Sequence, residues 1–238
     1  MVIYGINPVL EALRAKRATL ISIASRSDER LSVVVQLAQQ QHVTVHRVSP
    51  ADLERAARGG VHQGVVAEVK DAAHLSVEDL VSGAAGVPLL VVLDGIEDPH
   101  NLGAILRTVD AAGGDGVIRQ SRHAAPLGGT AAKASAGAVA HVRVADVVNI
   151  ARAIENLKEA GVWTVGLAGD APKSYSDIDL TLPTAFVVGA EGEGLRRLVR
   201  DRCDWLVSIP MQGHVQSLNV SVATGIALFE AVRQRRAN

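Results

Sequence analysis

The stretch LLVVLDGIEDPHNLGAILRTVDAAG, residues 89–113, decides the fold. It opens with an unbroken run of Leu and Val, which is typical of a strand buried on both faces of a parallel sheet. After a short loop, apolar residues recur from Leu102 to Val109 at the i, i+3, i+4, i+7 spacing of an amphipathic helix. A buried strand that leads into such a helix is the repeating unit of an α/β fold.

The same pattern continues to the end of the chain. Short apolar runs follow at residues 116–118, 141–144, 162–169, 185–191 and 205–211, most of them separated by helical stretches such as NIARAIENLKEAG. This alternation predicts a mainly parallel sheet covered by helices on both faces. In such sheets, the loops that leave the carboxyl ends of the strands build the ligand site.

The first 70 residues predict a smaller α/β module of their own. Helices are expected at 7–16, 28–41 and 49–59, with Asn7 as the cap of the first, and strands at 20–25, 43–48 and 64–70. Periodicity then fades while Gly and Ala become frequent, which predicts a linker. We therefore expect domains at 1–70 and 88–238, joined by a linker at 71–87.

Composition narrows the classes of function. The 238 residues carry a formal net charge of −1 and a single cysteine, Cys203, which excludes a disulfide framework and a cysteine-based metal cluster. Aromatic residues make up 3% of the chain, too few for a stacking platform for single-stranded nucleic acid. An RNA partner would have to be held by local basic patches. With no signal peptide and no apolar run of membrane-spanning length, we expect a cytoplasmic protein without a metal.

The loop and helix at 94–113 carry the first candidate residues. Asn101 is expected to cap the helix, and Arg107 falls on its polar face. Gly103, one turn before Arg107, leaves bare backbone that a partner or substrate can approach closely. A solvated arginine on an ordinary amphipathic helix remains the alternative.

The second candidate loop lies in FVVGAEGEGL, residues 186–195. It fails the dinucleotide fingerprint, because Arg197 stands where the third glycine belongs. Gly189 and Glu191 still place backbone amides and a carboxylate at a strand end, where they suit a small polar cofactor. A tight strand-to-helix turn is the alternative.

The third candidate is IPMQGHVQSLNVSVATGIALFEAVRQ, residues 209–234. Ser217 and Asn219 both favour helix N-caps, and a single cap is enough for one helix. The helix that follows is apolar nearly all round, which predicts that it is buried. A buried helix start with two polar residues indicates a site, or an interface with a second subunit.

Together these segments resemble a known family. DGIEDPHNLGAILRTVDAAG, VVGAEGEGL and IPMQGHVQSLNVSVATGIALFEAVRQ are similar to the three signature motifs of the SpoU-type (TrmH-like) RNA 2′-O-ribose methyltransferases. YGINPVLEAL and GVHQGVVAEV resemble the start and end of the L30e-like RNA-binding domain found in one subfamily, and KASAGAVAHVRV resembles a further family segment. The chain is most similar to the bacterial subfamily that methylates a guanosine ribose of 23S ribosomal RNA near the peptidyltransferase centre.

The resemblance implies a small L30e-like domain followed by a trefoil-knotted (SPOUT) α/β domain, a homodimer, and S-adenosyl-L-methionine as cofactor. The catalytic positions that it implies are Asn101, Arg107, Glu191, Ser217 and Asn219. The cofactor positions are Leu167, Gly189, Ile209, Met211 and Leu218. The family's proposed base is Arg107, but a guanidinium normally stays protonated, so binding a phosphate and the developing alkoxide is the less costly role.

Basic side chains that are candidates for contacts with RNA phosphates are Arg14, Arg17, Arg119, Arg122 and Lys133. The chain departs from relatives at Gly128 and Gly129, where Asn is frequent, and at Ala140, where Glu is frequent. These departures concern the target more than the chemistry. The alternatives are the same reaction on transfer RNA or on the thiostrepton-resistance site of ribosomal RNA, or a ribosome-assembly factor that binds RNA without turnover.

Overall fold

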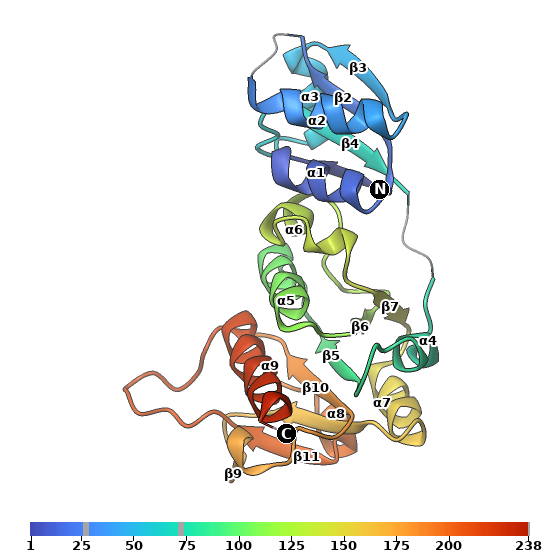
Figure 1. The fold of residues 1–238 in the computed structure, drawn as a ribbon. Coiled ribbons are helices and arrows are strands. Elements are labelled where there is room, and N and C mark those ends of the chain that lie inside the picture. The colour runs from blue at the N-terminus through green and yellow to red at the C-terminus, as the bar shows by residue number, and fades with distance from the viewer. Residues whose placement is uncertain (26–28, 71–73, 238) are drawn as a thin grey trace. The chain divides into compact units, whose positions relative to one another are not determined.

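The computed structural model describes residues 1–25, 29–70 and 74–237. The chain divides into two compact units that interleave along the sequence. The first consists of Met1–Ala73, Leu102–Arg107 and Pro126–His141, and the second consists of His74–Asn101, Thr108–Ala125 and Val142–Asn238. Each unit holds one β-sheet (Figure 1).

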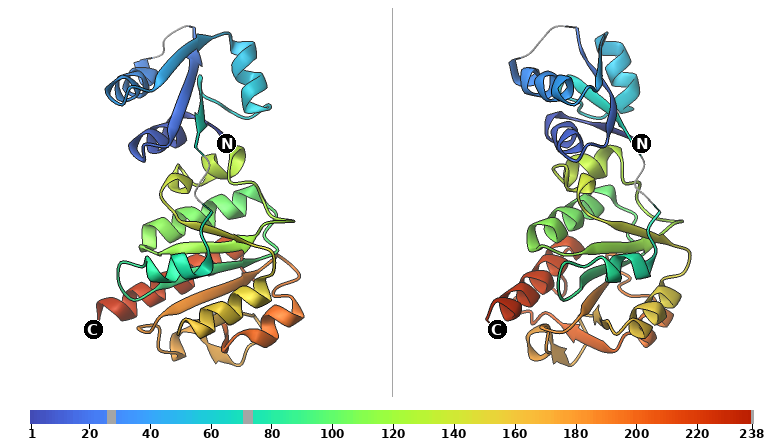
Figure 2. Two further views of the ribbon diagram at one scale, coloured as in Figure 1. Left: turned by 90° about the vertical axis from the view of Figure 1, so that its right-hand side faces the viewer. Right: turned by 45° about the vertical axis from the view of Figure 1, so that its right-hand side comes forward.

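The first unit is built on a four-stranded sheet in the order β1-β4-β2-β3 (Figure 2). Strand β4 pairs antiparallel with β1 and β2, whereas β2 and β3 are parallel. Its strands and helices alternate much as the sequence predicts, except for β1, which was not predicted: β1 Val2–Tyr4, α1 Ile6–Arg14, β2 Ala18–Ala24, α2 Glu29–Gln40, β3 Thr44–Val48, α3 Pro50–Ala57 and β4 Val65–Val69.

The start of α1 differs from the prediction. Asn7 lies inside the helix, and the N-cap position is Gly5, at a φ of 97°. The exposed N–H of Ile6 is satisfied from far along the chain, since it donates to Oε1 of Gln63 at 3.0 Å. The predicted cap at Asn7 is therefore wrong, because the side chain of Gln63, far away in the sequence, provides the acceptor that a local cap would provide.

The first unit also contains α6 (Gly129–Ala134) and the 3₁₀ turn η1 (Ala138–Ala140). Helix α6 packs so closely on α5 (Pro99–Ala112) that a Cβ on Gly103 would lie 2.5 Å from the Cβ of Ala134 and 2.7 Å from the carbonyl oxygen of Ala131. The backbone of Gly103 is therefore approached closely by helix α6 of the same chain. The expectation that a partner or substrate approaches there is wrong. Gly128 is equally tight, since its Cβ would lie 2.8 Å from the carbonyl oxygen of Val2.

The second unit is built on a seven-stranded sheet in the order β7-β6-β5-β10-β8-β11-β9. Every strand pair in it is parallel, which confirms the predicted sheet type. The strands are β5 Leu89–Asp94, β6 Gly116–Gln120, β7 Val144–Val147, β8 Trp163–Leu167, β9 Lys173–Ser174, β10 Thr184–Gly189 and β11 Trp205–Ser208. Strand β7 begins three residues later than expected, because His141 and Val142 form the turn that follows η1.

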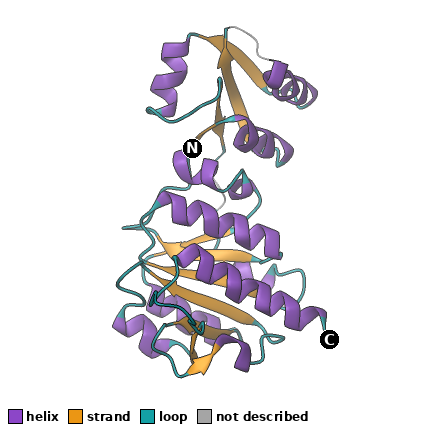
Figure 3. Ribbon diagram, turned by 90° about the vertical axis from the view of Figure 1, so that its left-hand side faces the viewer, coloured by secondary structure: helices purple, strands orange, loops and turns teal. Residues whose placement is uncertain are grey.

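Helices cover both faces of this sheet. On one face, apolar residues of α4 (Val77–Ser82), α7 (Ile150–Glu159) and α8 (Arg197–Arg202) form a core with β5, β6 and β10. On the other face, α9 (Val220–Arg236) packs along β10 (Figure 3). The 3₁₀ turn η2 (Tyr175–Asp177) follows β9. Helix α4 was not predicted and lies within the expected linker, of which residues 71–73 are outside the described part of the chain.

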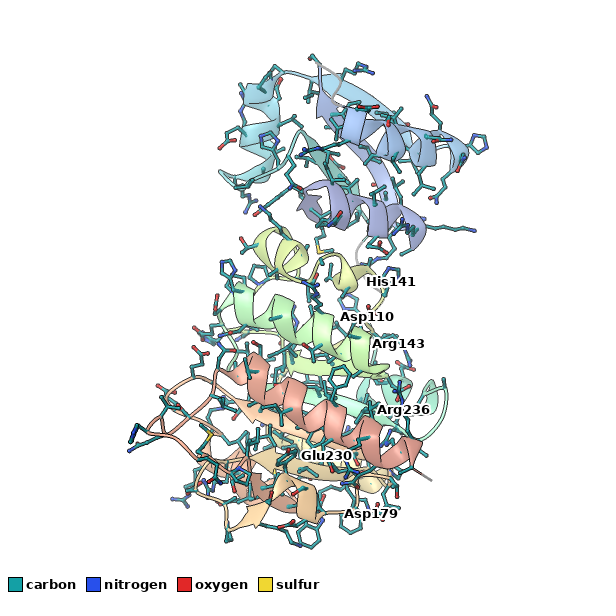
Figure 4. The ribbon with its side chains drawn as sticks, turned by 60° about the vertical axis from the view of Figure 1, so that its left-hand side comes forward. Asp110, His141, Arg143, Asp179, Glu230 and Arg236 are labelled. Carbon is teal, nitrogen blue, oxygen red and sulfur yellow. The ribbon has the colours of Figure 1, made fainter. Side chains whose placement is uncertain are left out.

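Helix α9 is only partly buried. Thr224, Ala227 and Leu228 have no exposed surface, but Val222 and Phe229 are each 50% exposed. Figure 4 shows Glu230 and Arg236 on the same helix. Within a single copy of the chain, the prediction of a fully buried helix is therefore wrong, because the apolar strip formed by Val222 and Phe229 is exposed. No helix among the described residues is long and apolar enough to cross a membrane.

Candidate active site

A pocket with a volume of about 470 Å³ lies at the carboxyl ends of β5, β6 and β10. Parallel sheets bind their ligands at this edge. The residues that line it come from the loops after these strands and from the start of α9: Asp94, Gly95, Ile96, Glu97, Asp98, Asn101, Gln120, His123, Ala190, Glu191, Glu193, Gly194, Arg196 and Val220.

Asn219 connects the three candidate loops. As the N-cap of α9, its Oδ1 accepts the backbone N–H of Ser221 at 2.9 Å. A backbone N–H can only donate, so this contact fixes the orientation of the amide and turns Nδ2 toward the other loops. Nδ2 donates to Oδ1 of Asn101 at 2.9 Å and also to Oε1 of Glu191. One residue therefore caps the helix and holds the site together.

Asn101 does not cap α5, contrary to the sequence prediction. The cap is Asp98, whose Oδ1 accepts the N–H of His100 at 3.0 Å, with Pro99 at the first helical position. Asn101 is 9% exposed, and its side-chain oxygen accepts from Asn219 instead. Because the cap is supplied three residues earlier, the Asn101 amide is available to the site.

Asp94 and Arg196 form an ion pair that sequence reasoning missed. Asp94 is 1% exposed at the end of β5. It accepts the backbone N–H of Arg196 at 2.9 Å and its Nε at 2.7 Å, and it also contacts Nη2. A carboxylate at the end of a fully buried strand was the signal in the sequence, because a buried charge needs a partner.

Position 189 requires glycine because the backbone of Gly194 passes very close to it. The loop after β10 folds back through a bridge between Ala190 and Gly194. A Cβ on Gly189 would lie 2.1 Å from the carbonyl carbon and oxygen of Gly194, a distance that no side chain tolerates. This packing sets the position of Glu191, which lies in the same loop. A role for the Gly189 backbone in holding a cofactor remains a prediction.

The other predicted cofactor residues lie near the same edge of the sheet without lining the pocket. Leu167 ends β8, Ile209 and Met211 follow β11, and Leu218 precedes α9. All four are partly buried. Since β10, β8 and β11 are neighbours in the sheet, these residues and Gly189 follow three adjacent strands.

Two predicted catalytic residues make no hydrogen bond to the Asn219 network within the described residues. Ser217 is exposed in the loop before α9 and makes no hydrogen bond within the described residues. Arg107 is exposed on α5, six residues after Asn101. The structure therefore brings together Asn101, Glu191 and Asn219 of the five predicted positions.

The predicted RNA-binding side chains differ in how far their own unit engages them. Arg17, Arg119 and Lys133 all donate to backbone carbonyl oxygens. Arg14 is exposed and pairs with Glu11, one turn away. Arg122 is exposed and has no partner among the described residues. Arg14 and Arg122 are thus the most accessible of the five, and their contact with RNA remains a prediction.

Neither a thiol nor a metal cluster is evident at the site. Burial and the nearby Asp204 carboxylate raise the pKa of Cys203 to about 12, so its thiol stays protonated. Among residues 1–25, 29–70 and 74–237, no group of three or more His, Cys, Asp or Glu side chains is placed to hold a metal ion.

Comparison with known proteins decides the family. The model of the SpoU rRNA Methylase family matches residues 88–229, which include the first two candidate loops and residues 209–229 of the third. The chain belongs to the SpoU rRNA methylase family. The N-terminal part of this SpoU chain matches a second model, described as RNA 2′-O ribose methyltransferase substrate binding, over residues 2–75. These matches confirm the resemblance noted in the sequence.

Full-length relatives of this SpoU family member include the 23S rRNA (guanosine-2′-O-)-methyltransferases RlmB of Pseudomonas aeruginosa and Vibrio cholerae. Both are 46% identical to the chain; the first alignment covers 98% of the chain and 96% of the relative, and the second covers 99% and 96%. Among solved structures, the SpoU methyltransferase AviRb from Streptomyces viridochromogenes in complex with AdoMet is similar with a TM-score of 0.83 and 26% identity. That match covers 100% of the chain and 91% of AviRb.

Proposed function

We propose that the protein transfers a methyl group from S-adenosyl-L-methionine to the ribose 2′-hydroxyl of a guanosine in 23S ribosomal RNA. The observation that carries this proposal is Asn219, which joins the loops of Asn101 and Glu191 beside a pocket of nucleoside size. The names of the RlmB relatives, 46% identical over nearly the full chain, support the target.

The cofactor, when bound, supplies an electrophilic methyl group on a sulfonium. We assign its binding to Leu167, Gly189, Ile209, Met211 and Leu218, which follow three neighbouring strands. Three of these side chains are aliphatic and one is a thioether, and backbone amides and carbonyls lie beside them. This set suits a ligand with an apolar thioether stem and a polar adenosine.

On the substrate side, the amides of Asn101 and Asn219 orient the ribose. Alignment of the acceptor oxygen with the methyl carbon supplies a large part of the rate in such a displacement. Glu191 holds Asn219 in place, and Ser217 contacts the ribose or Arg107. Arg107 binds an RNA phosphate and stabilises the 2′-oxygen as the hydroxyl proton passes to water.

The wider organisation belongs to the same proposal. We assign RNA binding to residues 1–70, a linker to 71–87 and methyl transfer to 88–238, with the segment before α9 forming a trefoil knot. The uncovered apolar strip of Val222 and Phe229 on α9 supports a homodimer. We also assign the protein to the cytoplasm, where a ribosomal RNA substrate is found.

The test is incubation with methyl-labelled S-adenosyl-L-methionine and protein-free ribosomal RNA, followed by mapping of the labelled nucleotide. The expected result is one 2′-O-methylated guanosine in 23S RNA. Label on a ribose of transfer RNA or at another ribosomal site would change the assigned target but leave the assigned reaction, 2′-O-methylation, unchanged. Label on a base would contradict the proposal, as would RNA binding without any transfer.

A further inference from the structure

Arg196 uses only part of its hydrogen-bonding capacity. A guanidinium carries five N–H donors in a rigid plane, and they form more than one two-pronged edge. Asp94 engages the edge formed by Nε and Nη2. Nη1 makes no hydrogen bond within the described residues. The side chain of Arg196 is 51% exposed, whereas that of its carboxylate partner is 0% exposed.

Asp94 also fixes where the remaining donors lie. It holds the backbone N–H of Arg196 as well as the side chain, so both ends of the residue are tied to β5. Since the guanidinium is planar, fixing one edge fixes the other, formed by Nη1 and Nη2. Arg196 lines the pocket, so a rigid pair of donors belongs to its wall.

The other charges in the lining decide what these donors recognise. Arg196 is the only Lys or Arg among the described lining residues, and its positive charge already faces Asp94. Glu97, Asp98, Glu191 and Glu193 line the same pocket, with His123 as the remaining titratable side chain. An additional phosphate would meet four carboxylates, so a neutral group with two adjacent acceptors fits better than an anion.

Guanine has that chemistry. Its O6 and N7 are adjacent acceptors that match the two donors of an arginine edge, whereas adenine offers an amino donor in place of O6. The opposite edge of guanine carries the N1–H and N2–H₂ donors. Glu97 and Glu193, which have no hydrogen-bond partner among the described residues, line the pocket as acceptors for such donors.

We propose that Arg196, held in place by Asp94, reads the target base as guanine through its Nη1 and Nη2 donors. The inference rests on the proposed function and adds the residue that selects the base. The pocket volume of about 470 Å³ suits a single unstacked nucleoside. Arg196 is thus a specificity residue, and Asp94 is a positioning residue that acts through it.

The experiment uses two short RNAs that differ at the mapped target only, one with guanosine and one with 7-deazaguanosine, which lacks the N7 acceptor. Methylation kcat/KM and, without the methyl donor, equilibrium RNA binding are measured for the full-length chain. Wild-type protein is expected to prefer guanosine about 10-fold in both readouts, because one of two paired hydrogen bonds is lost. Methylation of the guanosine RNA reports on the proposed function, and the ratio between the RNAs reports on Arg196.

Two variants complete the test. Arg196→Lys keeps the charge beside Asp94 but loses the two-pronged edge, so the guanosine preference should fall to about 1. The matched control is Arg197→Gln, because Arg197 is 95% exposed, pairs only weakly with Asp201 at 3.7 Å and lies outside the pocket lining. Its preference should equal that of the wild type.

The inference would be overturned by a wild-type ratio near 1, or by an Arg196→Lys variant that loses binding equally on both RNAs. The second result would mean that Arg196 contributes to RNA binding without reading N7 of the base. Thermal unfolding of each variant is measured alongside. Because the ratio is internal to one protein sample, a partly unfolded variant does not distort it.

Discussion

Arg196 and Arg235 lie at opposite ends of the same parallel sheet and use their donors differently. At the amino end, Arg235 donates to four backbone carbonyl oxygens over distances of 2.7–3.0 Å. These oxygens belong to residues in the segments before β5 and β10: Val87, Pro88, Leu180 and Leu182. Burial lowers the pKa of its guanidinium. At the carboxyl end, Arg196 satisfies one carboxylate, and its Nη1 donates to no residue that the structure describes.

The difference separates a structural arginine from a functional one. A side chain whose three nitrogens all donate to its own chain stabilises the fold. A side chain that is held rigidly and still has unused donors is prepared for a ligand. The predictions below test this contrast between the amino and carboxyl ends of the sheet, from the largest expected effect to the smallest.

Arg107→Ala should have the largest effect. The Arg107 side chain is exposed and makes no hydrogen bond within the described residues, so its loss should leave folding and oligomeric size unchanged. Removing the charge that stabilises the developing alkoxide should lower kcat by about 1000-fold. Single-turnover methylation, together with melting temperature and gel filtration, measures this. Near-normal activity would remove Arg107 from the chemical step.

Arg235→Met should show the opposite behaviour. It leaves four carbonyl oxygens without their donor, which should lower the free energy of unfolding by about 3 kcal/mol. The kcat/KM and the guanosine preference should stay at the wild-type values at temperatures where the variant is folded. Urea unfolding and methylation kinetics separate the two. A changed base preference would break the contrast with Arg196.

Asn219→Ser separates two roles of Asn219: its hydrogen bonds to Asn101 and Glu191, and its role as the N-cap of α9. Serine is also a good N-cap, so the stability of α9 should change by less than about 0.5 kcal/mol. The amide donor to Asn101 and Glu191 is lost, and kcat/KM should fall roughly 10- to 100-fold. Asn219→Ala is the companion variant, because it removes the cap as well and should cost about 1 kcal/mol more stability. Equal activity of Asn219→Ser and wild type would mean that the residue only caps the helix.

A smaller effect concerns pH at the amino end of the sheet. Burial raises the pKa of Asp204, but hydrogen bonds from Lys158 and Thr164 outweigh it and the pKa is lowered overall. A lowered pKa means that this carboxylate stabilises the fold above its unfolded pKa of about 4 and that the contribution is lost as the pH falls through the folded value. Asp204→Asn should therefore be less stable than wild type at pH 7, and the difference should shrink below pH 4. A difference that does not depend on pH would assign the effect to packing.

The sequence predicted the parts of the fold that depend on local pattern. The unbroken apolar run of β5 and the periodicity of α5 gave the parallel α/β unit. The strands after it were placed correctly or within a few residues, except β9, which was not predicted. The short helix α4 was missed, because six residues with a capping box between Ser76 and Asp79 are too few to show periodicity. The family motifs then indicated the cofactor and substrate classes.

The sequence could not show which residues meet across long separations. Asn219 and Asn101 are 118 positions apart, and Arg196 and Asp94 are 102 positions apart. Local sequence preferences predicted Asn101 as the helix cap, because they do not show that Asp98 occupies that position. For the same reason Gly103 was read as an opening for a substrate, although α6 fills it.

The most direct measurement is the mapping of methyl label on protein-free 23S ribosomal RNA treated with wild-type protein, Asn219→Ser and Arg235→Met in parallel. The account predicts one guanosine with a 2′-O-methyl group, much less label there with Asn219→Ser, and wild-type label with folded Arg235→Met. Label on a base, or full labelling by Asn219→Ser, would contradict the claim that the pocket at the carboxyl end of the sheet is the site of methyl transfer.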